Sequence, residues 1–368
     1  MIKIRTKQVS VAFVAIFAGF TACCQLQAQD IFRGWNGNAS DDWMNTGNWD
    51  GGVIPSGASD TAAIRHSTNN RTVLYSGANA SLDRVYIGEQ STGHLTVQSG
   101  ASLATARNIN VTNNGTLINN GVMSVTGGLS AGGSSSVGIG NGGIFNGQIT
   151  ANSTSTVSID GRLNGNFNIQ SSVRQQIGAT GVVNGDVRVG GNDILTIAGE
   201  VSGGLFNVNQ TGKVVIESTA TILSEGANSW LYNTADVTWN VGADGSVGTL
   251  RTNRNESTVG AFDGEWRYDA TTLMTVILDA YDAATHGETI TMSLVSDIQN
   301  DSTFGSNVKF MRDGQDVSGD FTHNEKGSFT GTIPAVPEPA TYALLTGCLG
   351  FVFVCLRRMR AHRSASLN

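Results

Sequence analysis

A seven-residue motif recurs at nearly constant spacing in the middle of this 368-residue chain. Each copy begins with glycine, carries Asn-Gly or Ser-Gly at its fourth and fifth positions, and ends on an apolar residue. The four copies start at Gly143, Gly161, Gly181 and Gly199, so the intervals are 18, 20 and 18 residues. A unit this short cannot bury its apolar side alone, whereas stacked copies share one continuous core.

Short alternating runs precede the copies, as in Val157-Ser158-Ile159 and Leu195-Thr196-Ile197, and this period of two is typical of strands. We therefore predict an all-β fold, a parallel β-solenoid of about seven coils between Leu82 and Ile222, with β-rich caps. At about 4.8 Å between strands these coils form a rod roughly 34 Å long. A β-sandwich with evenly spaced hairpins is the alternative, and the fixed spacing of one motif favours the solenoid.

Composition excludes several classes of protein. The charged fraction of 14% is too low, and the hydrophobic fraction of 39% too high, for a disordered chain. The net charge of −7 argues against binding of nucleic acid through its phosphates. The four cysteines, Cys23, Cys24, Cys348 and Cys355, lie near the two ends, so the central part has neither disulfide nor thiolate site.

Charge density divides the chain into regions. Residues 90–220 hold ten charged residues, whereas residues 221–336 hold 22. We assign residues 81–225 to the solenoid repeats and residues 226–335 to an acidic, β-rich C-terminal module that closes the open end of the solenoid. Residues 29–80 are assigned to a Trp-rich N-terminal β cap.

The N-terminus has the three parts of a secretory signal peptide. Three basic residues precede an uncharged apolar run from Val9 to Phe20, and small and polar residues follow to Ala28. We predict that residues 1–28 are removed after passage through the Sec translocon. The alternative is a lipobox at Phe20-Thr21-Ala22-Cys23 that would leave Cys23 lipidated.

The C-terminus carries a second predicted targeting signal, in addition to the signal peptide. Pro337-Glu338-Pro339 precedes an uncharged segment for which we predict a transmembrane helix over residues 340–356, and Arg357 and Arg358 follow it. These arginines place the tail in the cytoplasm by the positive-inside rule. The alternative is an ordinary tail anchor that happens to follow a Pro-Glu-Pro.

This tripartite tail, residues 336–368, resembles the PEP-CTERM sorting signal of Gram-negative bacteria. The resemblance implies processing by an exosortase-type membrane enzyme, an intermediate anchored in the inner membrane, and a final place at the cell surface or in the extracellular matrix. Extracellular polysaccharide of a biofilm is the candidate partner that the resemblance implies. No nucleic-acid partner is expected.

The N-terminal flank resembles the opening module of secreted β-helical proteins with autotransporter-like repeats. The residues that carry this resemblance are Trp35, Trp43, Asn48-Trp49, Pro55 and Asp60-Thr61-Ala62. Trp35, Trp43 and Trp49 are candidate glycan-binding residues, because planar rings stack on sugar faces. The competing interpretation is that these rings plug the first coil, since tryptophan contributes a large buried area to packing.

The sequence predicts no catalytic residue, no metal site and no cofactor. Asp160, Asp186, Asp193, Glu200 and Glu217 are spread over the repeats; Asp186 and Glu200 fall at different phases of the repeat, whereas Arg162 and Glu200 share one. The histidines are isolated in sequence and match no zinc spacing. The leading hypothesis is therefore a non-enzymatic, structural or adhesive surface protein. A polysaccharide lyase or hydrolase on a β-helix and a glycan-binding module are the alternatives.

Overall fold

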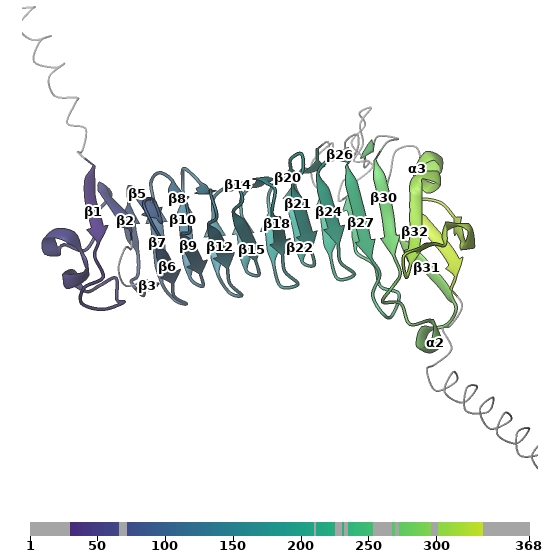
Figure 1. Cartoon of the computed structure of the whole chain (residues 1–368), viewed down its shortest axis with the longest axis horizontal. Coiled ribbons are helices and arrows are strands. Elements are labelled where there is room, and N and C mark those ends of the chain that lie inside the picture. Colours follow the sequence, from purple (N-terminus) through teal and green to yellow (C-terminus); the bar gives the residue numbers. More distant parts are fainter. Residues whose placement is uncertain are drawn as a thin grey trace, which may run out of the picture.

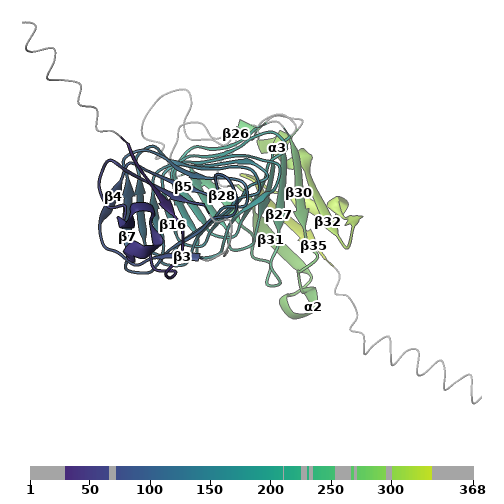
Figure 2. The ribbon, with the colours of Figure 1, turned by 60° about the vertical axis from the view of Figure 1, so that its left-hand side comes forward.

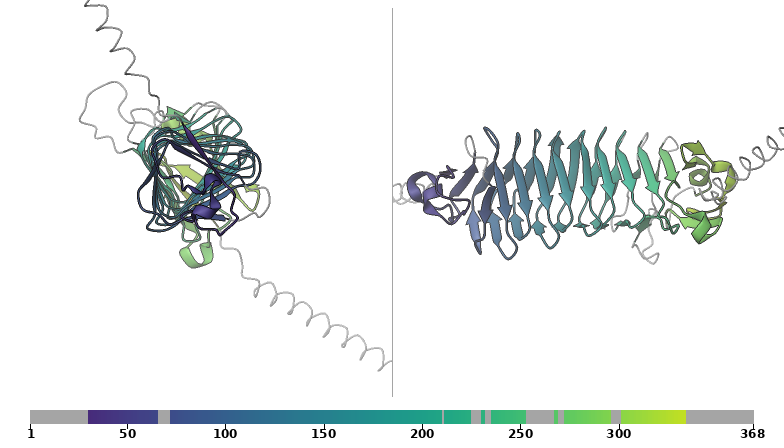
Figure 3. Two further views of the ribbon diagram at one scale, coloured as in Figure 1. Left: turned by 90° about the vertical axis from the view of Figure 1, so that its left-hand side faces the viewer. Right: turned by 60° about the horizontal axis from the view of Figure 1, so that its bottom comes forward.

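The computed structural model is a rod built from one parallel β-solenoid of about eight turns (Figure 1). The structure describes residues 30–65, 72–209, 211–224, 230–231, 235–252, 267–268, 272–295 and 301–333. Figure 3 views the rod from its N-terminal end and from the side, and shows the coils wound around a common axis. The prediction of an all-β parallel solenoid is confirmed.

Three parallel sheets form the walls of the rod, and each coil adds one strand to every wall. Sheet 1 consists of β1 (Ile31–Trp35), β2 (Asp60–Ile64), β5 (Arg84–Ile87), β8 (Ile109–Val111), β11 (Leu129–Ala131), β14 (Ile149–Ser153), β17 (Phe167–Ser171), β20 (Val187–Val189), β23 (Phe206–Val208), β26 (Trp230–Leu231) and β29 (Arg267–Tyr268). Sheet 2 consists of β4 (Ala80–Leu82), β7 (Ser102–Thr105), β10 (Val122–Val125), β13 (Ile144–Asn146), β16 (Arg162–Asn164), β19 (Val182–Asn184), β22 (Glu200–Gly204), β25 (Thr221–Ser224) and β28 (Thr249–Thr252). Sheet 3 consists of β3 (Thr72–Tyr75), β6 (His94–Val97), β9 (Thr116–Asn119), β12 (Ser136–Ile139), β15 (Thr156–Ile159), β18 (Arg174–Ile177), β21 (Ile194–Ile197), β24 (Lys213–Ile216), β27 (Asp236–Asn240), β30 (Leu273–Ile277), β32 (Val308–Arg312) and the antiparallel β33 (Gln315–Asp316).

The solenoid extends beyond residues 81–225 at both ends, which corrects the predicted boundaries. Strands β1 to β4 of the N-terminal region and strands β27, β30 and β32 of the acidic region pair in the same parallel ladders as the repeats. The additional turns come from these flanks. The glycine motif does not mark these turns in the sequence. Register is set by backbone pairing and by inward apolar side chains, and neither requires the motif.

A separate antiparallel sheet closes the C-terminal end. It consists of β31 (Thr289–Ser293), β35 (Ser328–Thr332) and β34 (Phe321–His323), and the short helices α2 (Ala283–His286) and α3 (Asp301–Asn307) lie beside it (Figure 2). Phe310 of the last parallel coil packs against Phe321 and Phe329 of this sheet, with ring centroids 4.0 and 5.1 Å apart. The predicted β-rich cap is thus the distal part of the acidic region, with solenoid coils before it.

The core consists of apolar side chains stacked from coil to coil. In sheet 3 the register places Ile139, Ile159, Ile177 and Ile197 in one column, and each is at most 1% exposed. Alternate residues of the same strands face solvent, as the period of two requires. Each isoleucine therefore packs on its equivalents one coil above and below, and these contacts combine with the backbone ladder.

Glycine is required at the corners because successive coils approach closely there. Gly147, Gly165 and Gly185, the fifth residues of three motif copies, have φ of 142°, 151° and 157°. A Cβ atom on Gly165 would overlap the carbonyl oxygen of Gly147, and one on Gly185 would overlap that of Gly165. The repeated glycine thus marks a column in which only hydrogen fits between coils.

The residue before this glycine forms a side-chain ladder. Asn164 Nδ2 donates to Asn146 Oδ1 at 2.8 Å, and Asn184 Nδ2 donates to Asn164 Oδ1 at 2.9 Å. Asn146 continues the ladder to Ser124 at 3.1 Å, and Ser202 donates to Asn184 at 2.9 Å. In each Asn-Gly pair of the motif, the asparagine therefore supplies a side-chain hydrogen bond between coils, and the glycine allows the coils to pack closely.

One buried glutamine side chain replaces backbone hydrogen bonds that are missing from the ladder of sheet 3. Residues are paired between β15 and β18 only at Ser158 and Ile159, so the first half of this ladder is open. Gln175, which is fully buried, accepts a hydrogen bond from the Val157 N–H at 2.5 Å and donates to the Ser155 carbonyl at 2.9 Å. Its side chain takes the place of the missing backbone partner, which avoids the cost of an unpaired buried amide.

We predict that Ile159→Asp destabilises the protein strongly, by about 3 kcal/mol or more, because a carboxylate would enter a fully buried column without a partner. Arg162→Ala, at an exposed position three residues away, should change the free energy of unfolding by less than about 0.5 kcal/mol. Urea denaturation of both variants measures the difference. Equal destabilisation would contradict the assignment of inward and outward positions.

We also predict that Gly165→Ala costs about 2 kcal/mol or more, because the methyl group meets backbone and the left-handed φ of 151° is strained for alanine. Gly138→Ala is the matched control, since a Cβ at Gly138 meets no atom within 4 Å. It should be neutral or slightly stabilising. Thermal melts of the two variants compare them, and a stable Gly165→Ala protein would disprove the close approach of the coils.

Candidate functional site

The three N-terminal tryptophans form a buried aromatic cluster. Trp35, Trp43 and Trp49 are 3, 0 and 1% exposed. The ring of Trp49 lies edge-on to those of Trp35 and Trp43, at centroid distances of 5.0 and 4.6 Å, and Trp43 meets Tyr75 at 5.3 Å. No face of these rings is open to a sugar, so their burial argues against the prediction that they bind glycan. They close the N-terminal end of the core, as the competing interpretation held.

Asn48 holds the loop that carries these rings, a role that the sequence analysis did not assign. Its side chain is fully buried. Its Oδ1 accepts hydrogen bonds from the N–H groups of Ala39 and Ser40, both at 2.8 Å, and its Nδ2 donates to the carbonyl of Asp42 at 2.8 Å. The anchored loop contains two short helical turns, η1 (Thr46–Asn48) and η2 (Asp50–Gly52). The Asn48-Trp49 pair was the only signal of it in the sequence.

The sorting residues fall outside the part of the chain that the structure describes. These are the signal peptide 1–28, the segment 336–368 with the transmembrane helix predicted over 340–356, and Pro337, Glu338, Pro339, Arg357 and Arg358. Among the described residues, no helix is both long enough and apolar enough to cross a bilayer.

The carboxylates of the repeats do not converge. Arg162 and Glu200 lie in one outward row of sheet 2, but Val182 stands between them, and no ion pair joins them in the described structure. Asp186 accepts a hydrogen bond from the Leu205 N–H at 3.0 Å and forms an ion pair with Arg188 at 3.1 Å. Within the described residues there is also no group of three or more His, Cys, Asp or Glu side chains arranged to hold a metal ion.

Two further carboxylates, Glu217 and Asp279, line one small pocket beside β27. Both oxygens of Glu217 accept hydrogen bonds from Asn240 Nδ2, at 3.1 and 3.0 Å. Asp279 accepts the N–H of Asp313 at 2.7 Å. These carboxylates therefore serve to hold neighbouring coils and loops together.

Asp193 is a buried acid of the solenoid. It lies at the corner before β21, where it is 4% exposed. Burial raises its pKa to about 6, against a smaller opposing effect of a hydrogen bond from the Gly190 backbone. Because the folded state binds the proton more tightly than the unfolded chain, this residue's contribution to stability is lost as the pH rises from about 4 through 6.

We predict that Asp193→Asn is more stable than the unmodified protein at pH 7, by about 1 to 3 kcal/mol, because the amide removes a buried charge. At pH 4 the aspartic acid is neutral, and the two proteins should have nearly equal stability. Urea denaturation at pH 4, 5, 6 and 7 tests this. A difference that does not depend on pH would show that burial of the charge is not the cause.

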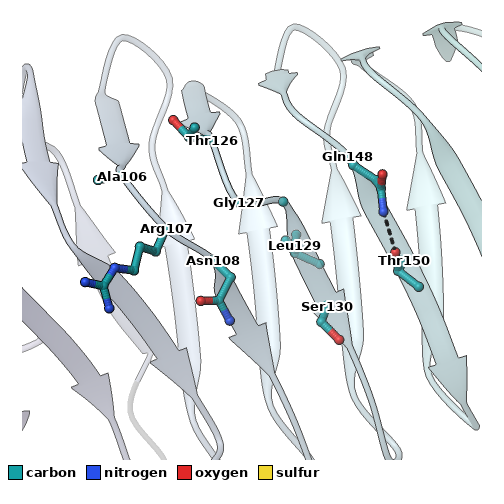
Figure 4. Close-up of a pocket in the computed structure, with 10 residues that line it drawn as sticks. Ala106, Arg107, Asn108, Thr126, Gly127, Leu129, Ser130, Gln148 and Thr150 are labelled. Carbon is teal, nitrogen blue, oxygen red and sulfur yellow. Dashed lines mark hydrogen bonds between the residues drawn. The ribbon is translucent and has the colours of Figure 1, made fainter.

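A shallow polar groove runs across the outer face of sheet 1 (Figure 4). It encloses about 460 Å³ and crosses β11 and β14 beside the corner that precedes β8. Ser130 and Thr150 belong to the successive strands β11 and β14, Asn108 lies just before β8, and Gln148 lies just before β14. The sequence carries no signal of this groove, because its residues lie in different coils and form no motif along the chain.

Comparison with known proteins gives one partial match. Residues 34–126 match a family described as a domain of unknown function, DUF8693. This segment begins in β1 and ends just after β10, so it contains the aromatic cluster and the first coils of the solenoid. No curated protein and no solved structure matches the chain.

Proposed function

We propose that this protein is an exported, non-enzymatic structural or adhesive rod of the cell surface or extracellular matrix of a Gram-negative bacterium. The observation that carries the proposal is the continuous solenoid: in the described residues its sheets have 11, 9 and 12 strands around one core, all parallel except the terminal β33. Such a rod holds its two ends apart at a fixed distance and presents long, flat side walls.

The interactions inside the rod support the proposal that the protein works in an oxidising extracellular compartment. No cysteine lies between Cys24 and Cys348, so the stability of the described part is independent of redox conditions. Backbone ladders, the isoleucine columns and the asparagine ladder provide it instead. These interactions need no cofactor and no metal.

The route to the surface rests on the two ends of the sequence. The N-terminal region has the pattern of a signal peptide, and the tail resembles a PEP-CTERM signal. The sequence Pro337-Glu338-Pro339 favours an extended junction, because proline fixes φ and the residue before it avoids the helical region. Glu338 is then a charged mark just outside the predicted apolar span, where an exosortase-type enzyme would read it.

We predict that Glu338→Ala leaves folding and Sec export intact but blocks processing, so the full-length protein stays in the inner membrane. Replacement of Arg357 and Arg358 by neutral residues should instead weaken membrane retention before processing. Fractionation of a protein tagged at both ends, in a host that has an exosortase, measures both effects.

Glu325→Ala is the control for this experiment, since Glu325 is an exposed glutamate in the folded part close to the tail. It should be processed normally. Normal release of the Glu338→Ala protein to the surface would disprove the sorting assignment and leave an ordinary tail anchor.

A further inference from the structure

Two consecutive glycines are among the residues that line the groove on sheet 1. Gly127 and Gly128 occupy the corner between β10 and β11. Gly127 continues the glycine column of Gly147 and Gly165, whereas Gly128 stands in register with Asn108 and Gln148, which carry side chains. A Cβ on Gly127 would lie only 2.9 Å from the backbone of Arg107 and Asn108, and Gly128 has a φ of 81°. Both positions thus require glycine, and at Gly128 the missing side chain leaves room between Asn108 and Gln148 of the neighbouring coils.

The walls of this depression carry paired amide and hydroxyl groups. Asn108 Nδ2 donates to Asn110 Oδ1 at 2.9 Å, and Gln148 Nε2 donates to Thr150 Oγ1 at 3.1 Å. Each bond uses one N–H of a primary amide and leaves its carbonyl oxygen and a second N–H for another partner. The pairs therefore fix the orientation of both amides while they keep donors and acceptors directed outward.

The charge of the groove is balanced. No carboxylate is among the residues that line it, and Arg107 is the one cation in that lining. Its guanidinium is already engaged, with Nε 3.2 Å from Asp83 Oδ1 and Nη1 3.8 Å from Asp30 Oδ2. A ligand would therefore meet neutral donors and acceptors rather than a net charge.

The polar groups also continue along the rod. The register places Asn110, Ser130, Thr150 and Asn168 in one outward row of sheet 1, one residue per strand. At about 4.8 Å per strand the row from Asn110 to Asn168 spans roughly 14 Å. A binding surface of this length suits an extended chain that runs across the strands better than a single small molecule.

From these observations we propose that the groove binds a neutral polysaccharide, with the chain lying along the rod and its hydroxyl groups bonded to Asn108, Gln148 and the outward row. Hydroxyl groups both donate and accept, and so match amides that offer both. The inference deepens the proposed surface function, on which it rests for its biological setting, by naming the class of partner.

Affinity electrophoresis of the purified protein in native gels tests this proposal. The gels contain a neutral β-glucan, a neutral galactomannan, dextran or the acidic polymer polygalacturonate. We expect at least one neutral polymer to retard the protein, with little effect of added salt, because screening acts on charges and not on neutral hydrogen bonds. The double variant Asn108→Ala/Gln148→Ala should bind that polymer roughly 10-fold more weakly, since two neutral hydrogen bonds are lost.

Gln176→Ala is the matched control, because Gln176 is an exposed glutamine on the outer face of sheet 3. It should bind as the unmodified protein does, and thermal melts should show all variants folded. Retardation by no neutral polymer, retardation only by polygalacturonate, or equal binding by the double variant would each overturn the proposal. The assay uses purified protein, so its failure is distinguishable from a failure of export or tail processing.

Discussion

The structure depends on the close stacking of one coil on the next in parallel register. Every N–H and C=O of a strand needs a partner in the neighbouring coil, so the coils must approach to about 4.8 Å along the whole perimeter. At the corners this distance leaves room for hydrogen alone at Gly165 and Gly185. The inward isoleucines and the outward amides take their positions from the same register.

Stacking of this kind makes polar side chains into structural elements. Asn146, Asn164 and Asn184 repeat the backbone ladder in their side chains. Gln175 supplies a hydrogen bond where the backbone ladder is open. Such residues would cost free energy if they were buried without partners, and the regular register provides those partners at every coil. The solenoid therefore tolerates an Asn- and Gly-rich sequence that a globular core would not.

The same register decides how the surface is composed. Outward residues of sheet 1 come from different coils, yet they form one row of amides and hydroxyls. Beside this row, Gly128 stands where the neighbouring coils carry Asn108 and Gln148, and these residues line the groove. By contrast, the three tryptophans that lie close together in the sequence are removed from the surface, because the open end of a solenoid core needs large apolar groups to cover it.

The sequence by itself determined the class of fold and the repeating unit. The interval of 18 to 20 residues, the alternation around Ile159 and the recurring Asn-Gly pair are local properties, and each has a direct physical meaning in a parallel stack. Tertiary structure alone decided how far the solenoid extends, that Trp43 and Trp49 are buried, and that Asn108 and Gln148 share one groove. These features depend on which residues of distant coils meet. That choice is made by backbone pairing across the stack, which leaves no periodic mark where the glycine motif is absent.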